Sequence, residues 1–167
     1  MMRRADLNDL EKIYQIIEET KIIFKNEGID QWQNGTPNKE SIKENIKDGG
    51  YVYEENGLVL GFCYLQKSED KNYRNVDGDD FIYDDYFIIH RFCVDPERRR
   101  EHIATKFFNE IEEYAKVNNF KSIRLDTHKD NIPMRNFIKK NNFEYRGIIM
   151  VDDVIKKAER MAFEKKL

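Results

Sequence analysis

Apolar positions recur at helical spacing in four segments of the chain. The pattern predicts a first helix from about Leu7 to Asn26, which begins after the N-cap residue Asp6 and ends at Gly28. Three further helices are predicted near Lys39 to Asp48, from Ile103 onwards, and over Pro133 to Lys140. In the helix that begins near Ile103, the apolar face consists of Ile103, Phe107, Ile111, Tyr114 and Ala115.

Shorter apolar runs between these helices are typical of strands. Tyr51 to Tyr53 and Leu58 to Leu65 flank Glu55-Asn56-Gly57, and Asn-Gly between two such runs favours a hairpin. Further strands are predicted over Asp84 to Val94, Lys121 to Thr127, Phe143 to Val151 and Arg160 to Lys165. The polar segment from Lys67 to Asp80 is expected to form an exposed loop.

The resulting order, β-α-α-β-β-β-α-β-α-β-β, predicts an α/β fold. A hairpin near the start and crossover helices later in the chain give a mixed sheet with helices on both faces. The sequence contains no internal repeat and no linker-like segment, so residues 1–167 are expected to form one domain.

The composition excludes several classes of protein. The chain has 167 residues, of which 40% are hydrophobic and 37% charged, as expected of a soluble globular domain. Its net charge of −3 gives no general attraction to nucleic acid. The two cysteines, Cys63 and Cys93, lie in apolar runs and are expected to be buried free thiols. No segment resembles a membrane span, a signal peptide or a metal-binding loop, so we expect a cytoplasmic protein with no membrane partner and no metal.

A cationic turn follows the strand that ends at Val94. The segment Val94-Asp95-Pro96-Glu97-Arg98-Arg99-Arg100-Glu101-His102 leads directly into the helix that begins near Ile103. The first turn of a helix has backbone N–H groups without intrahelical partners, and the helix dipole adds partial positive charge there. A strand, a cationic turn and a helix N-terminus in succession therefore predict an anion site, and the expected ligand carries phosphates. A solvated basic turn without a ligand is the alternative.

This segment resembles the acyl-CoA loop of the GNAT superfamily of N-acetyltransferases, whose pattern is Arg/Gln-x-x-Gly-x-Gly/Ala. Arg99 matches the first position and Ala104 the last, but His102 stands where the central Gly is expected. A second signature of that superfamily, Asn followed by a short helix and Gly-Phe, is similar to the segment from Asn131 to Phe143. The resemblance extends from Met1 to Lys166 and implies the GNAT fold, with a mostly antiparallel central sheet.

The resemblance also implies a binding site for acetyl-CoA. The pantetheine arm is expected between the strand that ends at Val94 and the strand Lys121 to Thr127, where the two splay apart. The expected cofactor-binding residues are Phe92, Cys93, Val94, Arg99, Arg100, Glu101, His102, Ile103, Ala104, Thr105 and Asn131. Asn131 could equally be the N-cap of the helix that follows it. Because His tolerates positive φ better than most residues, we expect the turn at His102 to keep its shape.

The expected general base is His90. Members of the superfamily frequently carry Glu at this position, and an imidazole with an ordinary pKa near ~6.5 can accept a proton at neutral pH. A structural histidine hydrogen-bonded across the sheet is the alternative, and His128 is a weaker candidate. The usual acid, a Tyr seven residues after the signature Asn, is replaced by Ile138, so Tyr145 or water would have to supply that proton.

The acceptor is expected to contact Trp32 and Gln33, in the loop between the first two helices; packing of Trp32 on the first helix is the alternative. An acidic stretch near the expected acceptor site would favour a cationic amine, although it could be only a solvated loop; it comprises Glu69, Asp70, Asp77, Asp79, Asp80, Asp84 and Asp85. We therefore predict an N-acetyltransferase that moves the acetyl group of acetyl-CoA to a primary amine, of a small molecule or a peptide, in a ternary complex. A non-catalytic acyl-CoA-binding module is the alternative, and the prediction leaves room for a homodimer.

Overall fold

One mixed sheet organises the chain in the computed structural model, which describes residues 1–67, 69–98, 101–152 and 157–167. Its strands are β1 (Met2–Arg4), β2 (Gly50–Glu55), β3 (Leu58–Gln66), β4 (Asp77–Gly78), β5 (Tyr86–Val94), β6 (Ser122–Thr127), β7 (Glu144–Asp152) and β8 (Lys157–Lys166). They lie in the order β1-β2-β3-β5-β6-β8-β7-β4. Only the β5–β6 pair is parallel among the pairs formed by the described residues, which confirms the mostly antiparallel sheet.

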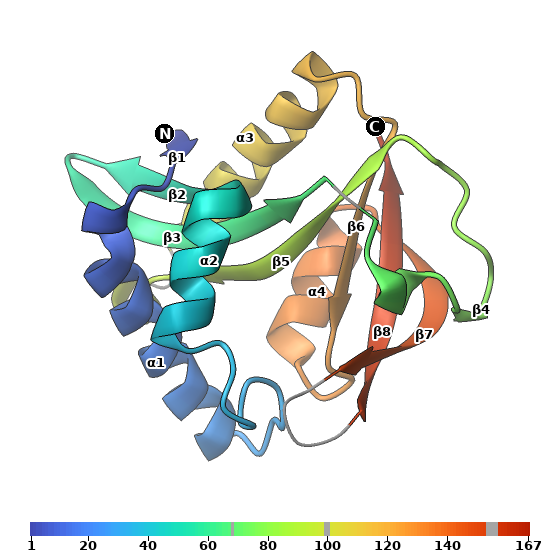
Figure 1. The fold of residues 1–167 in the computed structure, drawn as a ribbon, viewed down its shortest axis with the longest axis horizontal. Helices are drawn as coiled ribbons and strands as arrows, with labels where there is room; N and C mark the ends of the chain where they lie inside the picture. Colours follow the sequence, from blue (N-terminus) through green and yellow to red (C-terminus); the bar gives the residue numbers. More distant parts are fainter. Residues whose placement is uncertain (68, 99–100, 153–156) are drawn as a thin grey trace.

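Four α-helices in the described part of the chain cover the two faces of this sheet. Helices α1 (Leu10–Asn26) and α2 (Lys39–Gly49) pack on one face, and α3 (Ile103–Val117) and α4 (Ile132–Lys140) pack on the other (Figure 1). The predicted start of the first helix is a 3-10 turn, Leu7–Asp9, whose backbone N–H groups Asp6 caps. None of the described helices is both long enough and apolar enough to cross a membrane.

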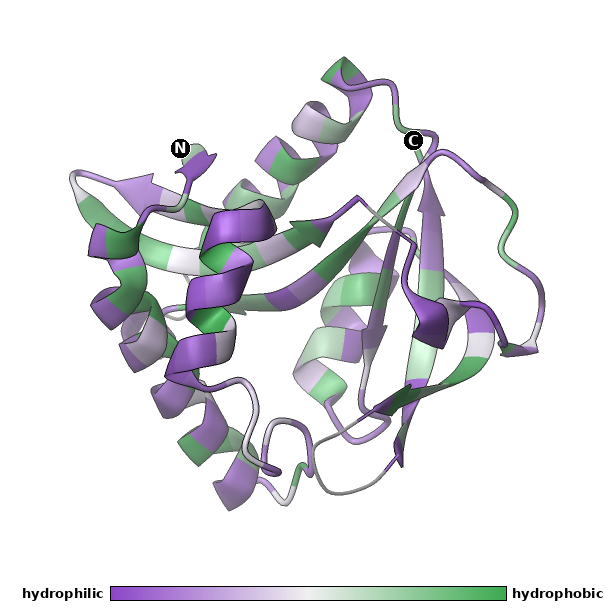
Figure 2. Cartoon of the chain, in the orientation of Figure 1, coloured by the Kyte–Doolittle hydropathy of each residue, from purple (hydrophilic) through white to green (hydrophobic). Residues whose placement is uncertain are grey.

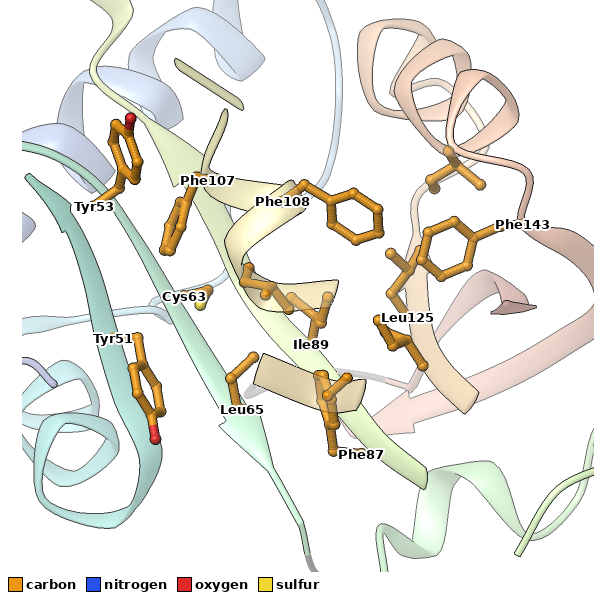
Figure 3. Close-up of a cluster of buried hydrophobic side chains, with 14 of the residues drawn as sticks. Tyr51, Tyr53, Cys63, Leu65, Phe87, Ile89, Phe107, Phe108, Leu125 and Phe143 are labelled. Carbon is orange, nitrogen blue, oxygen red and sulfur yellow. The ribbon is translucent and has the colours of Figure 1, made fainter. Parts of the chain in front are cut away.

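Two hydrophobic cores lie between these layers. The larger core lies under α3 and α4 and is rich in aromatic rings, among them Phe87, Phe107, Phe108 and Phe143 (Figure 3). The second core lies under α1 and α2, where isoleucines from both helices pack on Val52 and Phe62. The helices turn their apolar sides to the sheet and their polar sides to solvent, as the hydropathy colouring in Figure 2 shows.

The segment from Lys67 to Asp80 is more ordered than the exposed loop that its polarity predicts. It contains a 3-10 turn, Lys71–Tyr73, and the two-residue strand β4, which adds one strand to the predicted order. Tyr73 is only 4% exposed and packs against Ile88, Ile149 and Ala162. A single aromatic residue among polar ones gives no periodic signal, so the sequence pattern could not reveal that this segment docks on the sheet.

Strands β5 and β6 separate part of the way along their length. Their parallel pairing runs from Tyr86↔Ser122 to Ile89↔Leu125, and among the described residues the rest of β5 pairs only with β3. Figure 1 shows the two strands diverging beyond this point. The predicted splaying of these strands is therefore confirmed.

A buried ionic network fixes the segment that leads into β5. The Glu164 carboxylate is 1% exposed and accepts hydrogen bonds from Ser122 Oγ at 3.1 Å, Arg124 Nε at 3.1 Å and the Ile82 N–H at 2.9 Å. The Arg124 guanidinium lies 4.2 Å from the ring centre of Phe81 and 3.5 Å from that of Tyr86. The network therefore holds the chain between residues 81 and 86 against β6 and β8.

We expect Glu164→Ala to lower the free energy of unfolding by about 3–5 kcal/mol, because the substitution leaves the Arg124 cation buried without its carboxylate. Chemical denaturation followed by circular dichroism would measure the loss. Glu159→Ala, an exposed position on the same strand, is the matched control and should change stability by less than ~0.5 kcal/mol. Equal losses in the two variants would contradict this account of the network.

Candidate functional site

A cavity of about 340 Å³ lies where β5 and β6 separate, on the face of the sheet covered by α1 and α2. Its walls come from both diverging strands, from the loop after α1 and from the turn after β3. The residues that matter for its chemistry are Gln31, Trp32, Tyr64, Asp70, His90, Arg91, Phe92, Asp126, Thr127, Asn131 and Arg160. His90, Phe92, Trp32 and Asn131, four of the residues that the sequence analysis singles out, thus line the same cavity.

A β-bulge in β5 aims two consecutive side chains at this cavity. The register passes from Phe62↔Cys93 to Tyr64↔His90, so that Arg91 and Phe92 together lie opposite Cys63. Arg91 has a φ of 55°, a left-handed conformation that is uncommon for a residue other than glycine. Because a bulge interrupts the strict alternation of a strand, His90 and Arg91 both lie on the side of α1 and α2.

Four side chains surround the imidazole of His90. The Tyr64 ring stacks on it at a centroid distance of 5.7 Å, and the Tyr73 ring meets it edge-on at 6.5 Å. Asp70 Oδ2 lies 3.5 Å from His90 Nε2, and Asp126 accepts a 2.7 Å hydrogen bond from the Tyr73 hydroxyl. The turn after β3, with Asp70 from the acidic stretch, therefore forms one side of the histidine pocket.

These surroundings keep His90 neutral at physiological pH. Burial lowers the pKa of His90 below its ordinary value of 6.5, and the nearby Asp126 and Asp70 carboxylates offset part of that effect. His90 Nε2 is buried and has no hydrogen-bond partner among the described residues. A neutral imidazole with an unsatisfied nitrogen can accept a proton from a group bound in the cavity.

Gln31 connects the loop after α1 to the end of β6. Its Oε1 accepts hydrogen bonds from Thr127 Oγ1 at 3.3 Å, from the His128 N–H at 3.3 Å and from Asn131 Nδ2 at 3.0 Å. Asn131 is buried and caps α4, because its Oδ1 accepts from the Met134 N–H at 3.1 Å. Asn131 is therefore both the helix cap and a wall of the cavity.

The two predicted acceptor-binding residues have different positions. Trp32 lines the cavity. It also packs on Phe24 of α1 at a centroid distance of 5.5 Å, so lining the cavity and packing on the first helix do not exclude one another. Gln33 is not among the lining residues, because its side-chain amide donates to the carbonyls of Lys21 and Gln31. Gln31 lines the cavity instead of Gln33. Trp32, between the two glutamines, has a left-handed φ of 67° and turns the chain there.

Helix α3 begins directly after His102, a residue in the left-handed conformation. The N-cap residue His102 has φ 59° and ψ 20°, and among the described residues its side chain makes no capping hydrogen bond to the first turn of α3, where Ile103, Ala104 and Thr105 lie. The carboxylate of Glu101 pairs with Arg98 at 2.7 Å, and the buried Asp95 accepts from the Glu97 N–H at 3.0 Å. Arg99 and Arg100 lie outside the described residues.

Side chains at the end of β5 pack in the cores. Phe92 stacks with Phe107 at 5.5 Å and with Phe137 at 5.3 Å, and Val94 packs on the same core. Burial raises the pKa of the Cys93 thiol to about 12, so this thiol is not a nucleophile at neutral pH. Phe92, Cys93 and Val94 can thus offer a ligand mainly their backbone groups.

The remaining candidates for proton transfer lie away from His90. His128 lines a second hollow of about 230 Å³, and burial lowers its pKa. Ile138, at the position of the usual acid, is buried in the larger core. Tyr145 is exposed near the start of β7, whereas the cavity-lining Val151 lies near the other end of that strand. In the described part of the chain, no group of three or more His, Cys, Asp or Glu side chains is arranged to hold a metal ion.

Comparisons with known proteins agree on one family. Residues 10–143 match the family model of the Acetyltransferase (GNAT) family. A GNAT-family acetyltransferase from Streptococcus agalactiae superposes with a TM-score of 0.87 at 23% identity, over 100% of this chain and 95% of that chain. A GNAT-family acetyltransferase from Listeria monocytogenes gives a TM-score of 0.74 at 18% identity, over 100% and 94% of the two chains.

A third similar structure contains a ligand. The PaiA N-acetyltransferase of Thermoplasma acidophilum, in complex with coenzyme A, has a TM-score of 0.71 at 20% identity, over 100% of this chain and 98% of that chain. A search of curated protein sequences gave no significant match.

We expect Gln31→Ala to destabilise the protein by about 1–3 kcal/mol, because it removes the acceptor of three hydrogen bonds and leaves buried donors unpaired. Chemical denaturation would measure the loss. The exposed Gln15→Ala on α1 is the matched control, with an expected change below ~0.5 kcal/mol. If Gln31→Ala were as stable as that control, the loop would not depend on this amide.

Proposed function

The chain belongs to the GNAT family of acetyltransferases, and from this premise we propose that it moves the acetyl group of acetyl-CoA to a primary amine. The proposal takes residues 1–167 as a single catalytic domain that works in the cytoplasm on a small-molecule or peptide amine. The observation that carries it is His90 Nε2, a buried and unsatisfied nitrogen in the cavity at the split between β5 and β6.

The proposed acetyl donor lies between the turn before α3 and the cavity. The N–H groups of the first turn of α3, to which the N-cap His102 makes no side-chain hydrogen bond, suit a pyrophosphate. The complex of the Thermoplasma acidophilum N-acetyltransferase with coenzyme A supports this choice of donor. Arg99 and Arg100 would add positive charge for the phosphates.

In the proposed reaction, the amine nitrogen attacks the thioester carbonyl carbon in a ternary complex. The C–N bond forms, the C–S bond breaks, and the sulfur leaves as the CoA thiolate. The amine gives its proton to His90 Nε2, which the low pKa keeps neutral beforehand. The buried Ile138 cannot donate a proton to the leaving group. No side chain is needed for that step, because the thiolate of a thiol with a pKa near ~8.5 leaves readily and takes a proton from water.

A non-catalytic acyl-CoA-binding module is the alternative. Two departures from the family pattern favour it, the buried Ile138 in place of a Tyr and His102 in place of a Gly. Both functions would bind acetyl-CoA, but only the enzyme would release CoA when an amine is added.

We expect wild-type protein to release CoA from acetyl-CoA in the presence of amines, and His90→Ala to reduce that turnover by about 10²–10⁴-fold. In the wild type, kcat/KM should rise with pH through the pKa of His90, below its ordinary 6.5, because only the neutral imidazole accepts a proton. In His90→Ala this acidic limb should be absent. A thiol-reactive dye would follow the released CoA.

His128→Ala is the matched control for this experiment, since His128 lies in the second hollow. Its pH profile should keep the acidic limb. A wild-type protein that binds acetyl-CoA but turns over no amine would support the binding module. Full activity of His90→Ala would move the base to another group.

We expect His102→Gly to leave the affinity for acetyl-CoA unchanged or to tighten it modestly. His102 already has the left-handed conformation that glycine adopts at less cost, so the substitution relieves strain in the turn. Calorimetric titration with acetyl-CoA would measure the change. A large loss of affinity would identify the imidazole itself as a phosphate ligand.

A further inference from the structure

Two arginine side chains line the cavity without a carboxylate partner. Neither Arg91 nor Arg160 has a carboxylate oxygen within 4.0 Å among the described residues, and Arg160 donates only to the Glu159 carbonyl, at 2.9 Å. The cavity-lining Asp152, by contrast, is paired with Lys71 at 2.5 Å. Buried cations without a counter-ion are costly, so these two arginines call for an explanation.

Arg91 is the one closer to the reacting groups. The bulge places it beside His90 on the same side of β5, and its charge is one of the causes that lower the pKa of His90, whereas the charge of Arg160 acts on His128. One end of the guanidinium is fixed to α2, because Nη1 donates to the Ser41 carbonyl at 2.9 Å and to Asn45 Oδ1.

The other end of the Arg91 guanidinium is available for a ligand. Its remaining N–H groups make no hydrogen bond with any described residue. Burial lowers the pKa of Arg91 to about 10, so it is still charged at neutral pH. Glu44 acts on it electrostatically, but no carboxylate oxygen of the described residues lies within 4.0 Å of it. A planar oxyanion would supply a close counter-ion, and the fork of N–H groups on a guanidinium matches a carboxylate.

Negative charge also lies close to His90. The Asp70 carboxylate is 3.5 Å from His90 Nε2, and the Asp126 carboxylate, which binds the Tyr73 hydroxyl, also acts on the imidazole. An ammonium group that enters the cavity therefore meets carboxylates next to the proposed base, while a carboxylate meets Arg91. The cavity is complementary to a zwitterion.

We propose that the acceptor is a free amino acid, whose carboxylate Arg91 binds while its amine faces His90. The proposal rests on the acetyltransferase function proposed above and specifies its acceptor. It distinguishes amino acids from simple amines, which lack the carboxylate, and from peptide N-termini, whose first carboxylate is replaced by a neutral amide.

Matched acceptors test this proposal in wild-type protein. Lysine, arginine and phenylalanine would each be compared with the amidated amino acid and with the decarboxylated amine, using CoA release from acetyl-CoA. For at least one amino acid, kcat/KM should exceed that of both its amidated and its decarboxylated analogue by roughly ten- to a hundredfold, as expected for one charge-assisted interaction. The difference should lie mainly in KM.

Arg91→Gln should abolish the preference for amino acids over their amidated and decarboxylated analogues. Arg91→Lys keeps the charge but not the planar set of guanidinium N–H groups, so it should retain part of the preference. Arg160→Gln should preserve the preference, since Arg160 lies toward His128. Arg74→Gln, an exposed position paired with Glu69, is the control outside the cavity and should leave all rates unchanged. Thermal unfolding of each variant would show whether the contact of Arg91 with α2 survives.

The outcomes separate this proposal from the one on which it rests. If wild-type protein acetylates the decarboxylated or amidated acceptors as well as the amino acids, or better, the acceptor assignment fails and the transferase stands. The same holds if Arg91→Gln lowers all three rates equally. If none of the acceptors releases CoA, both proposals fail. The wild-type comparison decides the question even if the Arg91 variants do not fold.

Discussion

The pairing of β5 with β6 stops at Ile89 and Leu125, and every part of the candidate site depends on that break. Beyond it, β5 pairs on one side only within the described part of the chain, with β3, and the bulge at Arg91 changes the direction of its side chains. Such an opening leaves backbone groups without ladder partners, which is tolerated where a ligand or water can reach them. The aromatic core under α3 and α4 keeps the open strand in place, because Phe92 stacks between Phe107 and Phe137.

Buried charges have two different roles in this protein. Glu164 and Arg124 satisfy one another and hold the segment before β5, so that network is complete without a ligand. Arg91 is fixed to α2 by neutral oxygen atoms alone, and no carboxylate oxygen of the described residues lies within 4.0 Å of it. A compensated pair stabilises a fold, whereas an uncompensated cation in a cavity is a property of a binding site.

The sequence pattern predicts most of the fold, because the periodicities of α1, α3, β5 and β6 are those of elements with one apolar face. It also identifies His90, Trp32 and Asn131, which stand next to motifs or beside glycine. It does not identify Gln31 or Tyr73, and it gives Asp70 only as one member of an acidic stretch near the acceptor site. These residues reach the cavity through loop conformations and long-range contacts, such as the docking of Tyr73 on Ile88 and the left-handed turn at Trp32, which no local pattern encodes.

The bulge in β5 has a consequence for how such a protein can evolve. On this short stretch of strand, His90 and Arg91 face α2 while Phe92 packs toward α3, so neighbouring residues belong to different surfaces of the sheet. Substitutions on the α2 side can therefore alter which molecule is recognised there without disturbing the aromatic support on the α3 side. Under the proposed function, the α2 side faces the acceptor, so a lineage could exchange its acceptor while the aromatic support of the strand stays the same.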